Sequence, residues 1–380
     1  MRTHPEWIDK LVGQPIATPA YVFSPEEMSR QMRKLGAALG TRVIFSVSAC
    51  PNSDLLMRQA EDVRFGVRCS SKAEMGLVAG WRTDYAFVTL PSMDEQTMRA
   101  VLGARFRLIV DASQQIELLA SLRGKREVVP ISLGVSVGLI EGCSDRGGDD
   151  VSRFGMDWDD LRLAIALARR HGVPVGGLYV FGGANSFGGR SLAIVRAMRD
   201  LAAQVEAELG GPLDVITIGA GLEAGWENKG HDFAAYRAEI AKFASHIQII
   251  HDVGRAAIAS AGCFVTKVVA RKNVNGRSYA ICDGGMAQAY LLSKAARDQQ
   301  LKSNPLVCGA GLELRQSNAA RCAAVTTIVG GSLSRDDILA ETNTDLNPGD
   351  LLFFPQAGAY CRTYTPGEYL GQGYAASYVL

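Results

Sequence analysis

The side chains best suited to acid–base chemistry in this 380-residue chain are two neighbours, His251 and Asp252. Histidine is the side chain whose ordinary pKa puts its charge change between pH 5 and 8. The five histidines stand at positions 4, 171, 231, 246 and 251, too few and too dispersed for an obvious triad or metal site. His251 is therefore the acid–base candidate, with a structural role as the alternative.

A second chemical feature is the segment Gly219-Ala220-Gly221, which follows an apolar run at 215–218. Backbone amides of a glycine-rich turn after a strand can hold a phosphate. Arg255 would add a fork of N–H donors to such an anion site, and Tyr360 a hydroxyl. The same glycines would equally serve tight turns, and both interpretations remain open.

Other kinds of chemistry have no signal in the sequence. It contains no Gly-x-Ser-x-Gly elbow and no P-loop. The eight cysteines form no Cys-x-x-Cys pair, which argues against structural zinc and predicts small buried thiols in a reducing compartment. Cys50, which follows an expected strand, could be a reactive thiol or simply a packed one.

The charge pattern excludes two kinds of partner. The net charge is +1 and the chain has no basic or acidic block, which argues against nucleic acid or a charged membrane surface. No apolar run reaches the length of a membrane-spanning helix. The N-terminus lacks the apolar core of a signal peptide, so we expect a cytoplasmic protein.

Strands and helices alternate up to about residue 250. Strands are expected at 43–47, 64–68, 85–89, 107–110, 130–137, 176–181 and 214–219. Amphipathic helices are expected at 26–38, 72–80, 94–102, 113–122, 158–170 and 191–209. The helix at 26–38 has Ser24 as its expected cap. Seven or eight parallel strands of this kind predict an α/β fold, either a TIM barrel or an open doubly wound sheet.

The pattern changes after about residue 255. Short β-rich runs at 262–270, 278–282, 324–329 and 351–354 predict a mostly antiparallel β domain. Asn275-Gly276 is typical of a hairpin turn. The polar stretch 294–320 is expected to be an irregular insertion.

Several short motifs occur in a characteristic order: Thr18-Pro19-Ala20-Tyr21-Val22, Ser152-Arg153-Phe154-Gly155, Gly254-Arg255, Asp283-Gly284-Gly285 and Gly358-Ala359-Tyr360. Together they resemble the fold-type III pyridoxal-phosphate (PLP) enzymes, the ornithine/diaminopimelate/arginine decarboxylase and alanine racemase group. The resemblance covers about residues 18 to 375. It implies an alanine racemase-like (β/α)8 TIM barrel at 26–255, a C-terminal β-sandwich or barrel domain at 256–380, and an N-terminal segment, 1–25, that packs with this β domain.

The resemblance also shows where the chain departs from the family. Phe45-Ser46-Val47-Ser48-Ala49-Cys50 stands where the family has a strand like Tyr-Ala-Val-Lys-Ala-Asn. The lysine that holds the cofactor is Ser48 here, and a hydroxyl cannot form an imine. The acid near that lysine becomes Arg68, the histidine that stacks on the pyridine ring becomes Phe181, and the glutamate that pairs with the pyridine nitrogen becomes Asp252.

Other family positions are kept or changed in part. Gly219 and Gly221 stand in the place of the glycine-rich phosphate loop, and Arg255 and Tyr360 match residues that meet the cofactor phosphate. Asp283 matches the Asp-Gly-Gly segment of the β domain. The cysteine that a partner subunit supplies to the site becomes Leu333.

The altered positions form a charge-related set. In the family a lysine, an acid and an arginine balance one another, and loss of the buried cation alone would leave the acid unpaired at a cost of several kcal/mol. Here all three have changed together, to Ser48, Arg68 and Gly134. This pattern favours natural loss of the PLP–lysine aldimine over an engineered Ser48 in a PLP-dependent decarboxylase. Arg68 would place a new guanidinium near the vacated lysine space.

Two functions follow as hypotheses. The chain could be a divergent decarboxylase-fold protein that acts on an amino acid or an amino-acid-derived molecule, a carboxy-lyase if it is active, with any PLP bound noncovalently. It could instead be an inactive pseudoenzyme that binds or regulates an active decarboxylase homologue. Family members work as dimers, so a homodimer or a heterodimer with a homologue is expected.

Overall fold

The computed structural model describes residues 4–58, 65–80, 83, 85–140, 153–309, 313–316 and 325–380. Two compact units make up the chain. We call Met32–Ser48 and Ala60–Ala256 together the barrel unit; Met1–Gln31, Ala49–Gln59 and Ala257–Leu380 form the sheet unit. The division after Ala256 lies beside the boundary expected at 255. Residues 49–59 belong to the sheet unit, although the chain enters them between two barrel strands.

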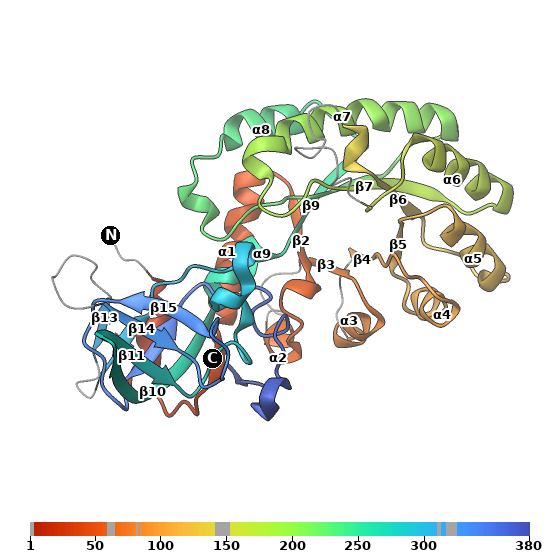
Figure 1. The fold of residues 1–380 in the computed structure, drawn as a ribbon. Helices are drawn as coiled ribbons and strands as arrows, with labels where there is room; N and C mark the ends of the chain where they lie inside the picture. Colours follow the sequence, from red (N-terminus) through yellow and green to blue (C-terminus); the bar gives the residue numbers. More distant parts are fainter. Residues whose placement is uncertain are drawn as a thin grey trace. The chain divides into compact units, whose positions relative to one another are not determined.

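The barrel unit is a closed ring of eight parallel strands in sequence order (Figure 1). They are β2 (Arg42–Ser46), β3 (Gly66–Cys69), β4 (Ala86–Val88), β5 (Arg107–Val110), β6 (Ile131–Val135), β7 (Val175–Phe181), β8 (Val215–Gly219) and β9 (Gln248–Val253). Strand β9 pairs with β2 and closes the ring, which confirms the TIM barrel and excludes the open sheet. The strand pattern of the sequence misses β9, because His251 and Asp252 interrupt its apolar run.

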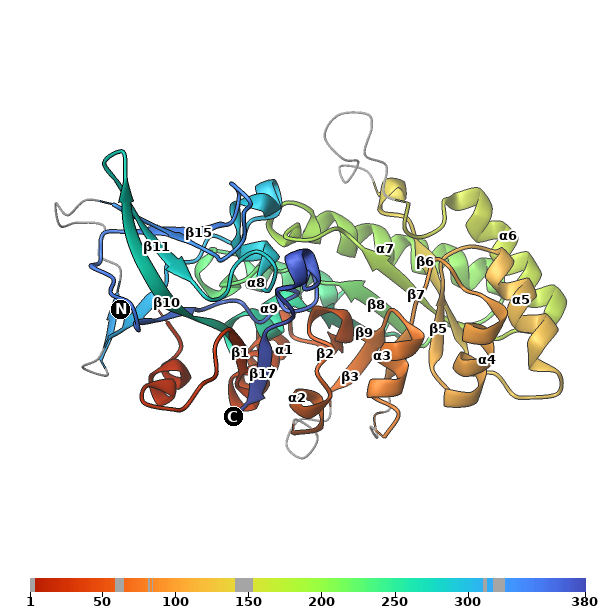
Figure 2. The same ribbon diagram turned by 60° about the horizontal axis from the view of Figure 1, so that its bottom comes forward.

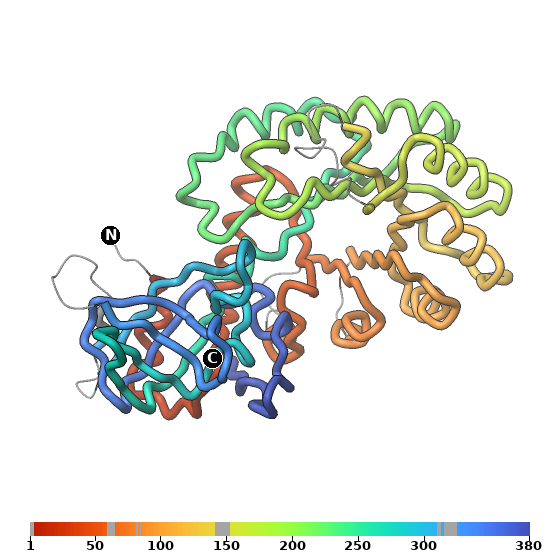
Figure 3. The backbone as a smooth tube through the Cα atoms, in the orientation of Figure 1, coloured from red at the N-terminus to blue at the C-terminus, as the bar shows by residue number. Residues whose placement is uncertain are grey.

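Helices cover the outer face of these strands (Figure 3). They are α3 (Lys72–Leu77), α4 (Glu95–Ala104), α5 (Gln114–Arg123), α6 (Trp158–His171), α7 (Phe187–Leu209) and α8 (Phe233–Ile240). Helices α4, α6 and α8 each begin behind an aspartate whose carboxylate accepts a backbone N–H of the first turn. Helix α1 (Pro25–Leu39) begins behind Ser24, whose Oγ accepts the N–H of Glu27 at 3.2 Å, as the sequence predicts.

Apolar side chains fill the middle of the barrel. Because side chains alternate along a strand, every second residue points inward. The inward cluster consists of Ile44, Phe87, Ile109, Val215 and Ile250. This layer makes the barrel a packed core, so polar chemistry is confined to the ends of the strands.

The sheet unit contains a nine-stranded sheet (Figure 2). Its strands are β1 (Ala20–Phe23), β10 (Gly262–Val274), β11 (Arg277–Cys282), β12 (Leu306–Cys308), β13 (Leu314–Gln316), β14 (Thr326–Val329), β15 (Ile338–Thr342), β16 (Leu351–Phe354) and β17 (Ala376–Val379). Among the described pairings within this sheet, only β1–β17 and β11–β14 are parallel, so the mostly antiparallel β domain is confirmed. Strand β1 pairs with β10, which ties the N-terminal segment to this sheet.

Two local predictions have different outcomes. Asn275 and Gly276 both have positive φ, 48° and 76°, as a two-residue hairpin turn between β10 and β11 requires. The stretch 294–320 is not simply an irregular insertion, because its described part contributes β12 and β13 to the sheet. Three-residue strands are too short to give a periodic signal in the sequence.

Within the described ranges, no helix is long and apolar enough to cross a membrane. The same part of the chain holds no group of three or more histidine, cysteine or acidic side chains that could ligate a metal.

Candidate functional site

Ser48 lies just past the C-terminal end of β2, in the short 3-10 turn η2 (Val47–Ala49). Ser48 is half-buried. Catalytic groups of TIM barrels come from the C-terminal ends of the strands, so Ser48 stands at the functional end of this barrel. Its hydroxyl can donate and accept hydrogen bonds, but it offers no amine for covalent attachment of an aldehyde.

Arg68 points into the barrel and pairs with Asp252. Its Nε donates to Asp252 Oδ2, and its Nη2 donates to Ser46 Oγ at 2.8 Å. The Ser46 hydroxyl in turn donates to Asp252 Oδ1 at 2.6 Å. These residues come from three adjacent strands, with β2 paired to β3 on one side and to β9 on the other. They therefore form a closed ring of hydrogen bonds inside the barrel.

The Arg68–Asp252 ion pair is buried. The side chain of Arg68 is 14% exposed and that of Asp252 is 2% exposed. Arg68 Nη1 also donates to Ser70 Oγ at 2.7 Å, and Tyr179 Oη donates to Asp252 Oδ2 at 3.3 Å. Removing one partner of a buried ion pair costs about 3–5 kcal/mol, because the other charge is left uncompensated. The ring is therefore charge-balanced, and removing either Arg68 or Asp252 would leave the other charge unpaired.

Asp252 has little capacity left for another partner. An ionised carboxylate offers about four lone-pair positions. The described structure directs three donors at Asp252, from Ser46, Arg68 and Tyr179. The position expected to face a pyridine nitrogen is thus engaged by the protein's own side chains.

His251 does not join this ring, and its buried setting argues against the expected acid–base role. Neighbouring residues on a strand point to opposite faces, so His251 turns away from the side that Asp252 faces. Its Nδ1 is 2.6 Å from Thr41 Oγ1 and its Nε2 is 2.6 Å from Tyr236 Oη. The residue is fully buried, and burial lowers its pKa to about 3. A neutral imidazole with both nitrogens engaged serves packing, as the structural alternative predicts.

Gly219 and Gly221 lie where β8 ends and packs against the end of β7. A Cβ on Gly219 would lie 2.5 Å from Phe181 Cδ2, and one on Gly221 would lie 2.6 Å from Ser186 Oγ. Gly221 also has a φ of +63°, which L side chains rarely adopt. The Ala220 N–H donates to the Asp252 carbonyl at 3.0 Å and is not available to an anion. These contacts support the turn interpretation, and the phosphate interpretation stays a prediction.

The other expected phosphate ligands lie in different units. Arg255 is the first residue of α9 (Arg255–Ile258), is half-buried and belongs to the barrel unit. Tyr360 belongs to the sheet unit, where its N–H donates to the Ala49 carbonyl at 2.7 Å. Its carbonyl accepts the N–H of Tyr364 at 2.8 Å, so Tyr360 shapes a turn at a φ of +64°. Their use in a phosphate site remains a prediction.

Asp283 and Leu333 have contrasting settings in the sheet unit. Asp283 Oδ1 accepts hydrogen bonds from Thr266 Oγ1 and the Lys267 N–H, and its Oδ2 accepts one from Thr18 Oγ1 at 2.6 Å. These bonds fasten three segments together and give Asp283 a structural role. Leu333, between β14 and β15, is 92% exposed.

One smaller prediction can be placed as well. Cys50 is buried, and burial raises the pKa of its thiol to about 12, which favours the packed thiol over the reactive one.

The sequence analysis missed some members of the site. Ser46 and Tyr179 donate hydrogen bonds to Asp252. The sequence could have indicated them because both residues occupy inward-facing positions of their strands, close to the C-terminal end of the barrel. Asp111 directly follows β5, and its Oδ1 accepts the N–H of Gly155 at 2.7 Å. Burial raises the pKa of Asp111. A carboxylate just past a barrel strand was the available signal for this residue.

Comparison with known proteins agrees with the fold. Residues 26–259 match the family model described as "Pyridoxal-dependent decarboxylase, pyridoxal binding domain". Diaminopimelate decarboxylase of Deinococcus radiodurans is 26% identical over 358 residues, which cover 92% of this chain and 86% of that protein.

Solved structures share the fold over nearly the full length. The diaminopimelate decarboxylase of Helicobacter pylori complexed with L-lysine has a TM-score of 0.81 at 17% identity and covers 98% of this chain and 93% of its own. The arginine decarboxylase of Paramecium bursaria Chlorella virus bound to agmatine has a TM-score of 0.79 at 16% identity and covers 98% and 99%. At sequence identities of 16–17%, these similarities support the fold alone.

Proposed function

The chain belongs to the pyridoxal-dependent decarboxylase family, and from this premise we propose that it binds an amino-acid-derived small molecule without covalent attachment to a lysine. Its relatives include decarboxylases of diaminopimelate and of arginine. The ligand would be amino-acid-like and would occupy the C-terminal end of the barrel. Any residual turnover would be that of a carboxy-lyase, while standard PLP chemistry is lost.

The observation that carries this proposal is the ring of Arg68, Ser46 and Asp252. An arginine replaces the family's acid, and it neutralises the one carboxylate that would otherwise face the pyridine nitrogen. Ser48 supplies no amine at the family's lysine position. Arg68, Ser46 and Asp252 form one network with a compatible balance of charge. An isolated engineered Ser48 would not be accompanied by such a network.

The donor set does not fit covalently held PLP. When bound in this family, the cofactor withdraws electrons from the substrate's reacting carbon. Here the residues at the lysine and pyridine-nitrogen positions are Ser48 and the Arg68-paired Asp252, so we assign no reaction step to the cofactor. What remains for a noncovalent anion, PLP included, is Phe181, the Gly219–Gly221 turn and Arg255.

A titration with PLP tests the proposal. The purified chain is titrated, absorbance is followed at the aldehyde and imine bands, and borohydride trapping is followed by peptide mass analysis. An active diaminopimelate decarboxylase serves as the positive control. We expect no stoichiometric lysine adduct in this chain. A lysine trapped at one equivalent would contradict the central claim.

The ligand itself is sought by calorimetry with free amino acids, their decarboxylated amines and their phosphorylated derivatives. We expect one class to bind with a stoichiometry of one. Arg255→Gln should weaken binding of phosphate-bearing compounds. Arg99→Gln, which removes an exposed arginine paired with Glu95 on α4, is the matched control. Failure of every compound to bind would favour the second candidate.

The second candidate is a noncatalytic partner of an active homologue, and the exposure of Leu333 favours it. The carboxylate of Asp337 accepts the N–H groups of Met286 and Ser332, which fixes the start of the loop that carries Leu333. Leu333 stands where the resemblance places the cysteine that a partner subunit supplies, and its exposed side chain is accessible to such a partner. We expect size-exclusion chromatography with an active decarboxylase homologue to show a complex that Leu333→Ser weakens. Leu163→Ser, on α6 and 49% exposed, is the control.

A further inference from the structure

Arg362 is a half-buried cation of the sheet unit. Its Nε is buried and has no hydrogen-bond partner among the residues that the structure describes, and none of their carboxylates forms an ion pair with it. A buried N–H without an acceptor is costly, and the cost rises when the group is charged. Such a donor in a folded protein therefore indicates an acceptor that comes from outside the chain.

The turn that carries Arg362 has a fixed position. The N–H groups of Thr363 and Tyr364 donate to the Tyr360 carbonyl at 3.1 and 2.8 Å. The Tyr360 N–H donates to the Ala49 carbonyl at 2.7 Å, which fastens the turn to a second segment of the sheet unit. Because the backbone is held in this way, an anion bound at Arg362 would not have to order the turn first.

Two neighbours of the Arg362 guanidinium are neutral. Burial raises the pKa of the Tyr21 hydroxyl well above its ordinary value and the pKa of the Cys50 thiol to about 12, and the nearby guanidinium opposes both rises. The Tyr21 hydroxyl is engaged elsewhere, because it donates to the Gln288 carbonyl at 2.9 Å. Tyr21 and Cys50 therefore leave the positive charge of Arg362 uncompensated.

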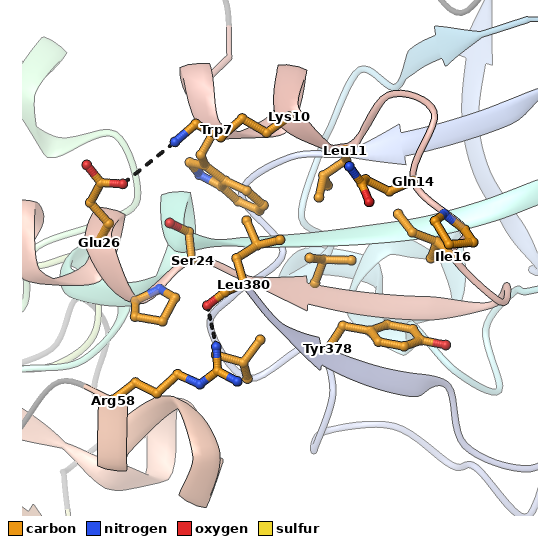
Figure 4. A pocket seen from close by; sticks show the side chains of 14 residues that line it. Trp7, Lys10, Leu11, Gln14, Ile16, Ser24, Glu26, Arg58, Tyr378 and Leu380 are labelled. Carbon is orange, nitrogen blue, oxygen red and sulfur yellow. Dashed lines mark hydrogen bonds and ion pairs between the residues drawn. The ribbon is translucent and has the colours of Figure 1, made fainter.

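Two other cations of the sheet unit have partners. They line a cavity of about 750 Å³ (Figure 4). Lys10 Nζ lies 3.8 Å from Glu26 Oε2, and Arg58 Nη1 donates to the main-chain oxygen of Leu380 at 2.6 Å. Arg362 differs from both, because its buried Nε has no partner within the described ranges.

We propose that Arg362 binds the carboxylate of a small molecule, whether or not the barrel holds an amino-acid-like ligand. Nε and one Nη of a guanidinium form a planar pair of donors that matches the two oxygens of a carboxylate. A carboxylate would satisfy the buried Nε–H and would balance one positive charge with one negative charge. A phosphate dianion would leave a negative charge in excess, and a neutral ligand would leave the cation uncompensated.

Sodium acetate is the probe, titrated at constant ionic strength against sodium chloride. An anion that binds the folded chain stabilises it, so the urea midpoint of the wild-type chain should rise with acetate concentration. Arg362→Met should lose this rise, and Arg362→Lys should bind acetate about tenfold more weakly because lysine lacks the planar fork. Arg271→Met, which removes a sheet-unit arginine paired with Asp345, is the matched control and should keep the full rise.

A second readout locates the anion. In spectra of the chain labelled with 15N-arginine, the Nε–H signal that Arg362→Lys removes should shift and saturate as acetate is added. Inorganic phosphate at about pH 8, where it is mostly a dianion, should shift this signal less than acetate does at the same concentration. Without acetate, Arg362→Met should unfold at no lower urea concentration than the wild-type chain, because it removes a donor that has no partner in the described part of the chain.

Four outcomes would overturn the proposal. The first is an equal dependence on acetate in the wild-type chain and in Arg362→Met, and the second is an Nε–H signal of Arg362 that acetate does not shift. The third is a stronger effect of phosphate than of acetate. The fourth is a clear loss of stability in acetate-free Arg362→Met, which would show that the guanidinium serves the fold itself.

Discussion

Arg68 on β3 forms a buried ion pair with Asp252 on β9, and Ser46 on the intervening strand β2 bonds to both. Each of the three side chains fills hydrogen-bonding capacity of the other two. This ring occupies the inward face of the barrel at the end where a TIM barrel does its chemistry. It explains how Arg68 can be buried without an unpaired charge.

Removing Arg68 should destabilise the barrel strongly. Arg68→Met leaves Asp252 buried without its cation, and we expect the free energy of unfolding in urea to fall by about 3–5 kcal/mol. Arg99→Met removes an arginine from an exposed pair with Glu95 and should cost no more than about 1 kcal/mol.

A double variant distinguishes the effect of the unpaired charge from the effect of lost packing. Asp252→Leu combined with Arg68→Met removes both charges, and the double variant should regain a large part of the stability that Arg68→Met loses. Simple addition of the two single losses would show that the ion pair is not the coupled unit described above.

Restoring a lysine should not by itself restore cofactor chemistry. Ser48→Lys supplies an amine, but Asp252 stays paired with Arg68. We therefore expect borohydride trapping of PLP at residue 48 to remain well below one equivalent. Ser48→Lys with Arg68→Asp also restores the family's acid and should trap more. Full trapping in the single variant would mean that Arg68 does not obstruct the cofactor position.

Buried His251 should make stability depend on pH. Burial lowers its folded pKa to about 3, whereas an unfolded histidine titrates near about 6.5. Below about pH 6.5 the unfolded chain therefore binds a proton that the folded chain does not. As the pH is lowered from about 6.5 to 3, the free energy of unfolding should fall by up to about 1.4 kcal/mol per pH unit because of this group. Above about pH 6.5 both states leave His251 neutral, so its effect on the pH dependence disappears.

Urea unfolding at a series of pH values measures this effect. His251→Gln keeps hydrogen-bonding groups for Thr41 and Tyr236 but cannot titrate, so its acid slope should be shallower than that of the wild-type chain. His246→Gln removes an exposed histidine and is the matched control. An unchanged slope in His251→Gln would contradict the burial argument.

Gly221 should resist substitution more than Gly189 does. A Cβ in Gly221→Ala would meet Ser186 Oγ at 2.6 Å and the Gly183 carbonyl at 2.7 Å, at a φ of +63°. We expect a loss of at least about 1–2 kcal/mol in unfolding free energy. Gly189→Ala meets nothing within 4 Å on α7 and should stabilise by roughly 0.5–1 kcal/mol. Equal tolerance at both positions would remove the steric argument for the β7–β8 turns.

The sequence alone predicted the fold class and seven of the eight barrel strands, and the structure confirms both. Those features are local: apolar runs of strand length and the spacing of strand and helix. The loss of the cofactor lysine at Ser48 stays a prediction. Ser46 and Tyr179 were missed because a serine and a tyrosine within a strand have no distinctive pattern. Strand β9 was missed because the polar residues His251 and Asp252 interrupt the apolar run by which a strand is recognised.

The contacts of Ser46, Arg68 and Asp252 depend on the tertiary structure. Positions 46, 68 and 252 are far apart in the chain, and the ring exists because the closed barrel places β9, β2 and β3 side by side. The same closure sends His251 outward against Tyr236 while Asp252 faces inward. Hydrogen-bond partners and burial depend on contacts between residues distant in sequence, and these contacts cannot be read from a single sequence.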